Sequence, residues 1–384
     1  MRLFPSQRLF FFHLTTGFLM CVLIALPVLA ERPPAGYARP PIHVRGNATG
    51  APTGLSPSQV RHAYGFDQIS NLGAGQKIAI VDAYDDPNIA FDLAKFKNQF
   101  GYGSSDCNFQ KIYASGSRPR TDAGWSLEIA LDVEWACAIA PQATIVLVEA
   151  ASNSYANLFQ AVDVAVAQGA SGISMSWGGS ESSSEVSYDG HFVHPNIVFT
   201  ASSGDSGNGV EYPAASPYVL AVGGTTLMLN PDGSYSSEKA WSGSGGGISA
   251  YEPRPTWQSS ANPANNRGVP DIAYDGDPAS GFSVYDSVRY QGQAGWFNVG
   301  GTSAGAPQWA AFIAIVNSGR TTPLSGPAAI YSVWTPSSPN FLDISSGTNG
   351  PCGAVCTAVP GYDYVTGVGS PSALNLYNAL VAQP

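Results

Sequence analysis

The chain has 384 residues, of which 17 are Lys or Arg and 27 are Asp or Glu, so its formal net charge is −10. This acidic balance argues against nucleic acid as a partner. Charged residues make up only 11% of the chain, whereas an ordinary soluble domain has roughly 25%. Few ion pairs suit a protein that works in acid, where carboxylate-dependent bridges fail, although many secreted proteins share this composition.

The first thirty residues have the pattern of a secretory signal peptide. Arg2 and Arg8 precede a long apolar run that ends in Val28-Leu29-Ala30, which matches a basic start, an apolar segment and a small residue before the cleavage point. The run is long enough to span a membrane, so an uncleaved anchor is the alternative. Residues 31–52 are rich in Pro, Gly and Ala and predict an extended arm in front of a folded domain at 53–384.

Apolar runs alternate with periodic segments through the first half of that domain. The runs predict buried strands at 77–84, 144–149, 172–177, 196–201 and 218–223, and the periodic segments predict helices near 88–100, 124–139 and 154–168. This alternation indicates a single α/β domain in which helices flank a parallel sheet. The region from about 230 to 300 is rich in Gly, Ser and Asn, which predicts long loops and hairpins.

Ser303 lies where small residues lead into another predicted helix. Gly300, Gly301 and Thr302 let the backbone turn tightly, and the apolar spacing of residues 310–316 is helical. A serine in the first turn of this helix would have free backbone amides and the positive helix end nearby, and both favour an oxyanion. An ordinary N-cap is the alternative, since serine is a preferred cap.

Glu128 and Asp132 lie four residues apart on a predicted helix and therefore project from one face. Their apolar neighbours between Leu127 and Val133 indicate that this helix is buried. Burial and mutual repulsion raise the pKa of such a pair, which suits a general base that works in acid. A solvated acidic face is the alternative, and the flanking apolar residues argue against it.

A third carboxylate, Asp205, follows the apolar run 196–199 within a Gly- and Ser-rich turn. The run predicts a buried parallel strand, so Asp205 would lie just beyond its carboxyl end, where open α/β sheets place their sites. An Asp in such a turn is usually an Asx-turn residue, and only its partners make it a candidate.

These motifs resemble those of the serine-carboxyl peptidases of the sedolisin and kumamolisin family. The matches are Glu128-x-x-x-Asp132, Ser-Gly-Asp205, Gly-Thr-Ser303-Ala-x-x-Pro307, the run 174–179 and a tail pattern of Asp343-Ile344 followed by residues 360–371. The resemblance covers roughly residues 52–384, and the ordered set is far more specific than any one motif. It implies a subtilisin-like α/β fold and peptidase activity.

The resemblance also implies a role for each matching residue. Ser303 would be the nucleophile, Glu128 its general base, and Asp132 the residue that orients Glu128 and shares a proton with it. Asp205 would donate a hydrogen bond in the oxyanion hole. A carboxyl group can donate only while protonated, so this role requires an acidic medium or a strongly raised pKa.

The tail pattern implies a calcium site by the same transfer. Asp343 and Asp363 would supply carboxylate oxygens, and the backbone carbonyls of Ile344, Val359 and Gly361 would complete an oxygen shell of the kind that Ca²⁺ prefers. Such sites often have Gly where Val359 stands, which is tolerable because the ligand is a carbonyl. Without the resemblance, a Pro-Gly-Tyr-Asp turn is the simpler interpretation.

Two further segments gain meaning from the resemblance. Asp82 ends the first predicted strand, where it either extends the proton network of the catalytic carboxyls towards Trp177 or caps the loop. The glycine-rich run 241–249 has the composition of a flexible linker, but a similar run lines the substrate cleft in the family, and its glycines would let a peptide backbone approach closely.

The remaining histidines and cysteines narrow the class of enzyme. His43, His62, His191 and His194 lack the setting of a subtilisin catalytic histidine, and His191-x-x-His194 lacks the Glu of a zinc protease. After the signal peptide four cysteines remain, which allow three pairings or free buried thiols. Sequence proximity favours Cys352 with Cys356 and Cys107 with Cys137.

We therefore expect a secreted, monomeric, calcium-stabilised endopeptidase that cuts unfolded polypeptides in acid. The alternatives are an inactive peptide-binding module with the same fold and an exopeptidase that releases tripeptides. Sedolisin-like enzymes carry a large N-terminal prodomain, whereas the arm at 31–52 is too short to build a core. This short arm is therefore the main departure from the family, and it leaves open how the chain folds and is kept latent.

Overall fold

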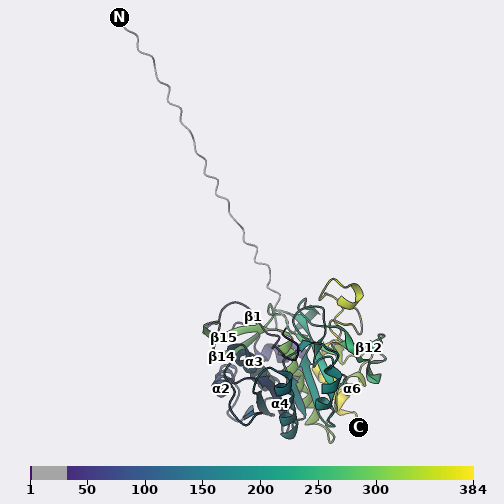
Figure 1. Ribbon diagram of the computed structural model, residues 1–384, viewed down its shortest axis with the longest axis horizontal. Coiled ribbons are helices and arrows are strands. Elements are labelled where there is room, and N and C mark those ends of the chain that lie inside the picture. Colours follow the sequence, from purple (N-terminus) through teal and green to yellow (C-terminus); the bar gives the residue numbers. More distant parts are fainter. Residues whose placement is uncertain (2–32) are drawn as a thin grey trace. The chain divides into compact units, whose positions relative to one another are not determined.

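The computed structural model describes Met1 and residues 33–384 of the chain (Figure 1). The predicted signal peptide at 1–30 lies, apart from Met1, outside the described residues. Residues 33–384 belong to one compact unit. Within that unit no helix is long and apolar enough to cross a membrane.

A sheet of eight strands forms the centre of this unit, with the order β10-β9-β7-β5-β2-β4-β3 and with β13 pairing to β9. All of these pairs are parallel except β9 with β10. The strands are β2 (Lys77–Ala83), β3 (Asn108–Tyr113), β4 (Thr144–Ala150), β5 (Gly172–Met175), β7 (Val198–Ser202), β9 (Val219–Leu229), β10 (Tyr235–Ala240) and β13 (Ile272–Asp275). The predicted α/β class with a parallel sheet is confirmed.

Helices cover both faces of the sheet, so the central strands are apolar on both sides. Ile78 and Ile80 of β2 face one core with α3 and α5, and Ala79 and Val81 face the other with α4. The helices are α1 (Pro57–Tyr64), α2 (Ile89–Phe100), α3 (Ala123–Ile139), α4 (Tyr155–Ala167), α5 (Gly305–Asn317), α6 (Ala328–Tyr331) and α7 (Ala373–Val381). The predicted helices near 88–100, 124–139 and 154–168 are thus present.

Helix α3 is buried along almost its whole length. Its N-cap Asp122 accepts hydrogen bonds from the amides of Gly124 and Trp125, which satisfies donors that the first turn leaves free. The helix packs against α2, α5 and the strand β14, and every residue from Trp125 to Ile139 is buried. A helix enclosed in this way carries its carboxylates into the interior of the domain.

The region from 230 to 300 contains more regular structure than its composition predicts. Its remaining strands are β11 (Gly247–Pro253), β12 (Asn266–Val269), β14 (Phe282–Tyr290) and β15 (Gln293–Gly300). The hairpin of β14 and β15 extends into a three-stranded sheet with β1 (His43–Val44), and β14 packs beside α2 (Figure 1). Short pairs complete the strands: β6 (Gly179–Ser180) with β8 (Glu211–Tyr212), and β16 (Phe341–Leu342) with β17 (Ser370–Pro371).

The arm that precedes the domain is extended and packs on its surface. Single bridges pair Tyr37 with Ser154 and Arg39 with Gly178, and β1 pairs with the end of β15. Ala38 is completely buried. Residues 33–52 therefore belong to the compact unit, although they form no core of their own.

Candidate active site

Helix α3 places Glu128 and Asp132 side by side in the interior, and both are 0% exposed. Burial and repulsion by Asp82 and Asp205 raise the pKa of Glu128 well above its ordinary value, while hydrogen bonding with Ser303 and Asp132 lowers it. Burial and repulsion by Glu128 raise the pKa of Asp132. A buried pair of this kind keeps at least one proton at pH values above the ordinary pKa of a carboxyl group.

Ser303 lies in a 3₁₀ turn, Thr302–Ala304, that leads directly into α5. The preceding Gly301 has a φ of 122°, and a Cβ there would lie 2.6 Å from Asp205 Oδ2, so only glycine fits this turn. Ser303 is 0% exposed. The Ser303 hydroxyl lies close enough to Glu128 to lower the pKa of that carboxyl, and no other polar group of the described residues holds its Oγ or either Glu128 oxygen.

Ser176 links the carboxyl pair to the segment that holds Ser303, the predicted nucleophile. Its Oγ lies 2.9 Å from Asp132 Oδ1 and 3.3 Å from the carbonyl oxygen of Ser303. The hydrogen bond to Asp132 lowers the pKa of that carboxyl against the effect of burial. Sequence analysis placed Ser176 only within the matching run 174–179 and gave it no role, because its partners come from α3 and from the turn at 303.

Asp82 lies at the end of β2 and is 0% exposed, with neither oxygen partnered among the described side chains and backbone. Of the two roles considered for Asp82, an extension towards Trp177 finds no hydrogen bond, since the Trp177 indole donates to the carbonyl of Val81 at 2.8 Å. Burial, followed by repulsion from Asp132 and Glu149, raises the pKa of Asp82. Asp82 therefore interacts with Glu128 and Asp132 through charge.

Asp205 follows β7, as predicted, and reaches the turn that carries Ser303. Its Oδ1 accepts hydrogen bonds from both the amide and the hydroxyl of Thr302, each at 2.8 Å. Its Oδ2 lies 3.3 Å from His43 Nε2. The hydrogen bond with Asp205 raises the pKa of His43. The structure thus brings Asp205 to Thr302, which is next to the predicted nucleophile Ser303.

The arm at residues 33–52 crosses this region, and sequence analysis did not predict that crossing. The amide and carbonyl of Arg39 pair with the carbonyl and amide of Gly178 at 3.0 and 3.1 Å. The Arg39 side chain reaches Ser206, next to Asp205. A Cβ on Gly301 would meet the carbonyl of Pro41. No local pattern in a Pro-rich segment signals these contacts, since their partners lie more than one hundred residues away.

The residues predicted to bind calcium lie together in the C-terminal loops. The amide of Gly361 donates to both oxygens of Asp343 at 3.1 Å, and the amide of Val359 donates to Asp363 Oδ2 at 3.1 Å. Thr366 Oγ1 joins Asp363 to the carbonyl of Ile344. Two carboxylates and nearby backbone carbonyls form a donor set whose chemistry fits Ca²⁺.

Three other features bear on the predicted site. The run 241–249 is not a flexible linker, because Gly245 and Gly246 are buried against the backbones of Ser203 and Tyr364. The expected disulfides, Cys107–Cys137 and Cys352–Cys356, are both formed.

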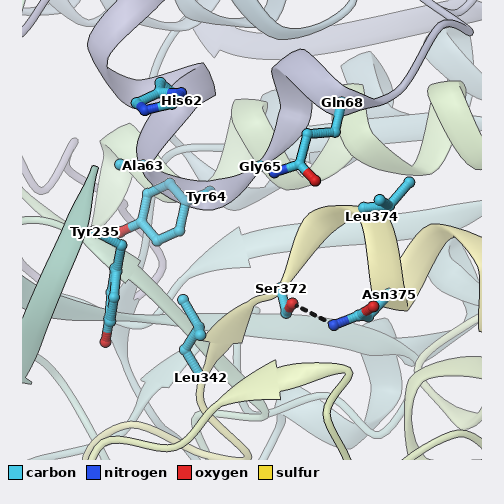
Figure 2. Close-up of a pocket in the computed structure, with 10 residues that line it drawn as sticks. All are labelled: His62, Ala63, Tyr64, Gly65, Gln68, Tyr235, Leu342, Ser372, Leu374 and Asn375. Atoms are coloured by element: carbon cyan, nitrogen blue, oxygen red, sulfur yellow. Dashed lines mark hydrogen bonds between the residues drawn. The ribbon is translucent and has the colours of Figure 1, made fainter. Parts of the chain in front are cut away.

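Figure 2 shows a hollow between α1 and the start of α7 whose described lining includes none of the predicted catalytic or calcium residues.

Comparison with known proteins shows to which family the chain is similar. The family model of the subtilase family matches residues 128–337, more than half of the chain. Kumamolisin from Bacillus sp. (strain MN-32) is 33% identical over 392 residues, which cover 90% of this chain and 68% of that protein. Tripeptidyl-peptidase 1 from Dictyostelium discoideum is 29% identical over 83% of this chain and 57% of its own length.

A solved structure agrees with the sequence relatives. Pseudomonas sedolisin, a serine-carboxyl proteinase solved with two molecules of pseudo-iodotyrostatin, superposes with a TM-score of 0.74 and 27% identity over 87% of this chain and 98% of that chain. Its fold, the matching subtilase model and the identity to kumamolisin all lead to one assignment. The chain therefore belongs to the sedolisin and kumamolisin family of serine-carboxyl peptidases, within the wider subtilase family.

Proposed function

We propose that the chain is a secreted endopeptidase that hydrolyses peptide bonds of unfolded polypeptides in acid, with Ser303 as nucleophile. The observation that carries this proposal is the convergence of Ser303, Glu128, Asp132 and Asp205 from three separate segments on one place in the interior. Burial raises the pKa values of Glu128 and Asp132, so this pair can share a proton in acid and still accept the one that a serine hydroxyl must lose.

In the first step, Ser303 Oγ attacks the carbonyl carbon of the substrate while its proton passes to the ionised oxygen of the Glu128–Asp132 pair. The carbonyl oxygen becomes negative and accepts a hydrogen bond from the protonated carboxyl of Asp205. When the tetrahedral intermediate collapses, Glu128 returns the proton to the leaving amine and an acyl-enzyme remains. Water then repeats the sequence and releases the acid product.

Asp205 can serve in this way only after the arm leaves the site. One of its oxygens accepts two hydrogen bonds from Thr302, and the other faces His43. A substrate oxygen must take the place of the His43 ring. We infer that the active enzyme has residues 37–45 displaced or removed.

The proposed calcium site stabilises the C-terminal loops. Asp343 and Asp363 with the carbonyls of Ile344, Val359 and Gly361 would hold Ca²⁺, which neutralises two carboxylates next to each other. Burial already raises the pKa of Asp363 to about 6, and bound Ca²⁺ would favour the ionised form. Secretion is supported by the basic and apolar pattern of residues 1–30 and by the two disulfides.

A tripeptidyl exopeptidase is the second candidate, favoured by the similarity to tripeptidyl-peptidase 1. An endopeptidase releases internal fragments of many lengths from a denatured protein, whereas the exopeptidase releases successive tripeptides from its N-terminus. Mass spectrometry of an early digest distinguishes the two. Exclusive tripeptide products would contradict the endopeptidase.

The assignment of residues is tested with three variants of the mature enzyme. Ser303→Ala and Glu128→Gln should each lose at least 1,000-fold in kcat, on the order of what catalytic-triad substitutions cost in serine peptidases. Ser126→Ala is the matched control, since Ser126 is equally buried on α3 and its hydroxyl bonds only the carbonyl of Asp122. Cleavage by folded Ser303→Ala at the control rate would refute the nucleophile.

A further inference from the structure

Three aspartates from distant parts of the chain meet in the interior, away from the residues described above. Asp86 follows β2, Asp92 lies in the first turn of α2, and Asp286 lies on β14. All three are 0% exposed, and each offers a carboxylate oxygen within 4.8 Å of the others. Contact between α2 and β14 brings them together.

Each aspartate has one oxygen fixed and one oxygen free. Asp86 Oδ1 accepts from the amide of Asn88 at 2.8 Å, and Asp286 Oδ1 accepts from the amide of Val288 at 2.7 Å. Asp92 Oδ2 accepts from the amide and hydroxyl of Ser287 at 3.0 and 3.1 Å. Asp86 Oδ2, Asp92 Oδ1 and Asp286 Oδ2 are buried and have no hydrogen-bond partner in the described part of the chain.

This arrangement is that of oriented ligands rather than of a satisfied hydrogen-bond network. Backbone donors hold one side of each carboxylate and fix its direction, as outer partners do for metal ligands. The opposite oxygens are left without the partner that a buried polar atom requires. They are therefore the atoms available to a ligand.

The nearby basic side chains are already engaged elsewhere. Lys111 Nζ lies 2.6 Å from Asp85 Oδ1 and 2.9 Å from Glu149 Oε1, and it reaches Asp86 only at its backbone carbonyl. Arg118 also pairs with Asp85. These two cations form their ion pairs with Asp85 and Glu149, and although the charge of Lys111 lowers the pKa of Asp86, burial outweighs it.

The electrostatics of the cluster agree with a missing positive charge. Burial and repulsion by Asp86 and Asp92 raise the pKa of Asp286 to about 8, and burial raises the pKa of Asp86 to about 7. Glu134 on α3 adds to the excess, since burial and repulsion by all three aspartates raise its pKa. Ionising the cluster without a cation would therefore be costly.

We propose that Asp86, Asp92 and Asp286 form a second divalent-cation site, distinct from the C-terminal loops and suited to Ca²⁺. Oxygen ligands around Ca²⁺ lie about 2.3–2.6 Å from the ion, so two of them can be up to about 5 Å apart. The spacing of the three carboxylates fits that limit. Because carboxylates are hard ligands, we expect this site to show no preference for soft metal ions.

A cation at this position would tie three elements together. It would join the loop after β2 and the start of α2 to β14, which pairs with β15. Since α3 packs against both α2 and β14, the ion would also support the helix that carries Glu128 and Asp132. Protons shared among the carboxyls are the competing explanation, and metal content separates the two.

The test counts bound metal in chains that cannot digest themselves. Ser303→Ala, and the same chain with Asp343→Asn and Asp363→Asn to disable the C-terminal loops, are equilibrated at pH 8 with CaCl₂ or MgCl₂. Gel filtration removes free ions, and bound metal is measured by mass spectrometry. We expect one Ca²⁺ per chain to remain in the loop-disabled protein, whose aspartate cluster is intact, and little Mg²⁺.

Adding Asp92→Asn and Asp286→Asn should remove that ion and abolish the calcium-dependent rise in melting temperature. A folded loop-disabled protein without bound Ca²⁺ or Mg²⁺ would overturn the proposal and favour shared protons. Retention of one ion after the cluster substitutions, with circular dichroism unchanged, would place the metal elsewhere. Because the decisive count is made on an intact cluster, it stands even if the last variant fails to fold.

Discussion

Replacing Asp82 with Asn should make the protein more stable than the wild type by an amount that grows with pH. Asp82 is fully buried, both of its oxygens lack partners among the described residues, and its pKa is raised above the ordinary 3.8. Above about pH 4 the unfolded chain ionises this carboxyl while the folded chain keeps its proton. The folded wild type therefore binds more protons and loses stability as pH rises.

One extra proton bound by the folded state corresponds to about 1.4 kcal/mol per pH unit. Asn does not titrate, so the stability of Asp82→Asn relative to the wild type should rise by up to about 1.4 kcal/mol for each pH unit over which the folded wild type keeps this proton. The buried amide of Asn also changes the free energy of unfolding, but by an amount that does not depend on pH, because an amide does not titrate. The slope with pH, and not the difference at one pH, therefore carries the prediction.

The assay is urea unfolding, followed by tryptophan fluorescence, at each pH unit from 4 to 7 in the Ser303→Ala background. Asp85→Asn provides an opposite control, because hydrogen bonds from Lys111 and Arg118 outweigh burial and lower the pKa of Asp85. Its stabilising contribution is present at neutral pH and fades in acid. A stability difference for Asp82→Asn that is constant or shrinks with rising pH would refute the reasoning.

Three other outcomes follow from the same contacts. Ser176→Ala should lower kcat by about 10- to 100-fold, since a hydrogen bond to a charged group contributes roughly 1.5–3 kcal/mol, and it should shift the pH profile, which a purely structural role would not do. Asp363→Asn should lower the melting temperature in CaCl₂ but hardly after chelation; an equal loss in both conditions would count against calcium in the loops. His43→Ala should leave the fold intact and speed the first turnover, measured by stopped flow on a peptide substrate, because the ring no longer faces Asp205; an unchanged rate would show that the arm does not obstruct the site.

Local patterns predicted those parts of the fold whose burial depends on near neighbours. The carboxylates of α3 were predicted because Glu128 and Asp132 repeat at helical spacing within an apolar segment. The position of Asp205 followed from the buried run in front of it. Strand β3 was missed because its side chains are only half-buried at the edge of the sheet, so it lacks the apolar run that marked the inner strands.

The missed features depend on contacts between distant segments. Nothing near His43 indicates that its ring meets Asp205, 162 positions further along the chain. The sequence left open whether Asp82 is linked to Trp177, and the indole donates instead to the backbone carbonyl of Val81. Asp86 and Asp286 lie two hundred residues apart, and only the packing of α2 on β14 brings them together.

The pH dependence of peptide hydrolysis tests the central claim most directly. Initial rates on an unfolded peptide should be highest in acid and collapse towards neutrality, because Asp205 must keep its proton and the Glu128–Asp132 pair acts while sharing one. A Ser-His-Asp enzyme would instead gain activity as its histidine loses a proton near a pKa of about 6.5. With stability checked separately at each pH, a maximum in acid supports the carboxyl mechanism, and a maximum at neutral or alkaline pH would contradict it even if Ser303 proved essential.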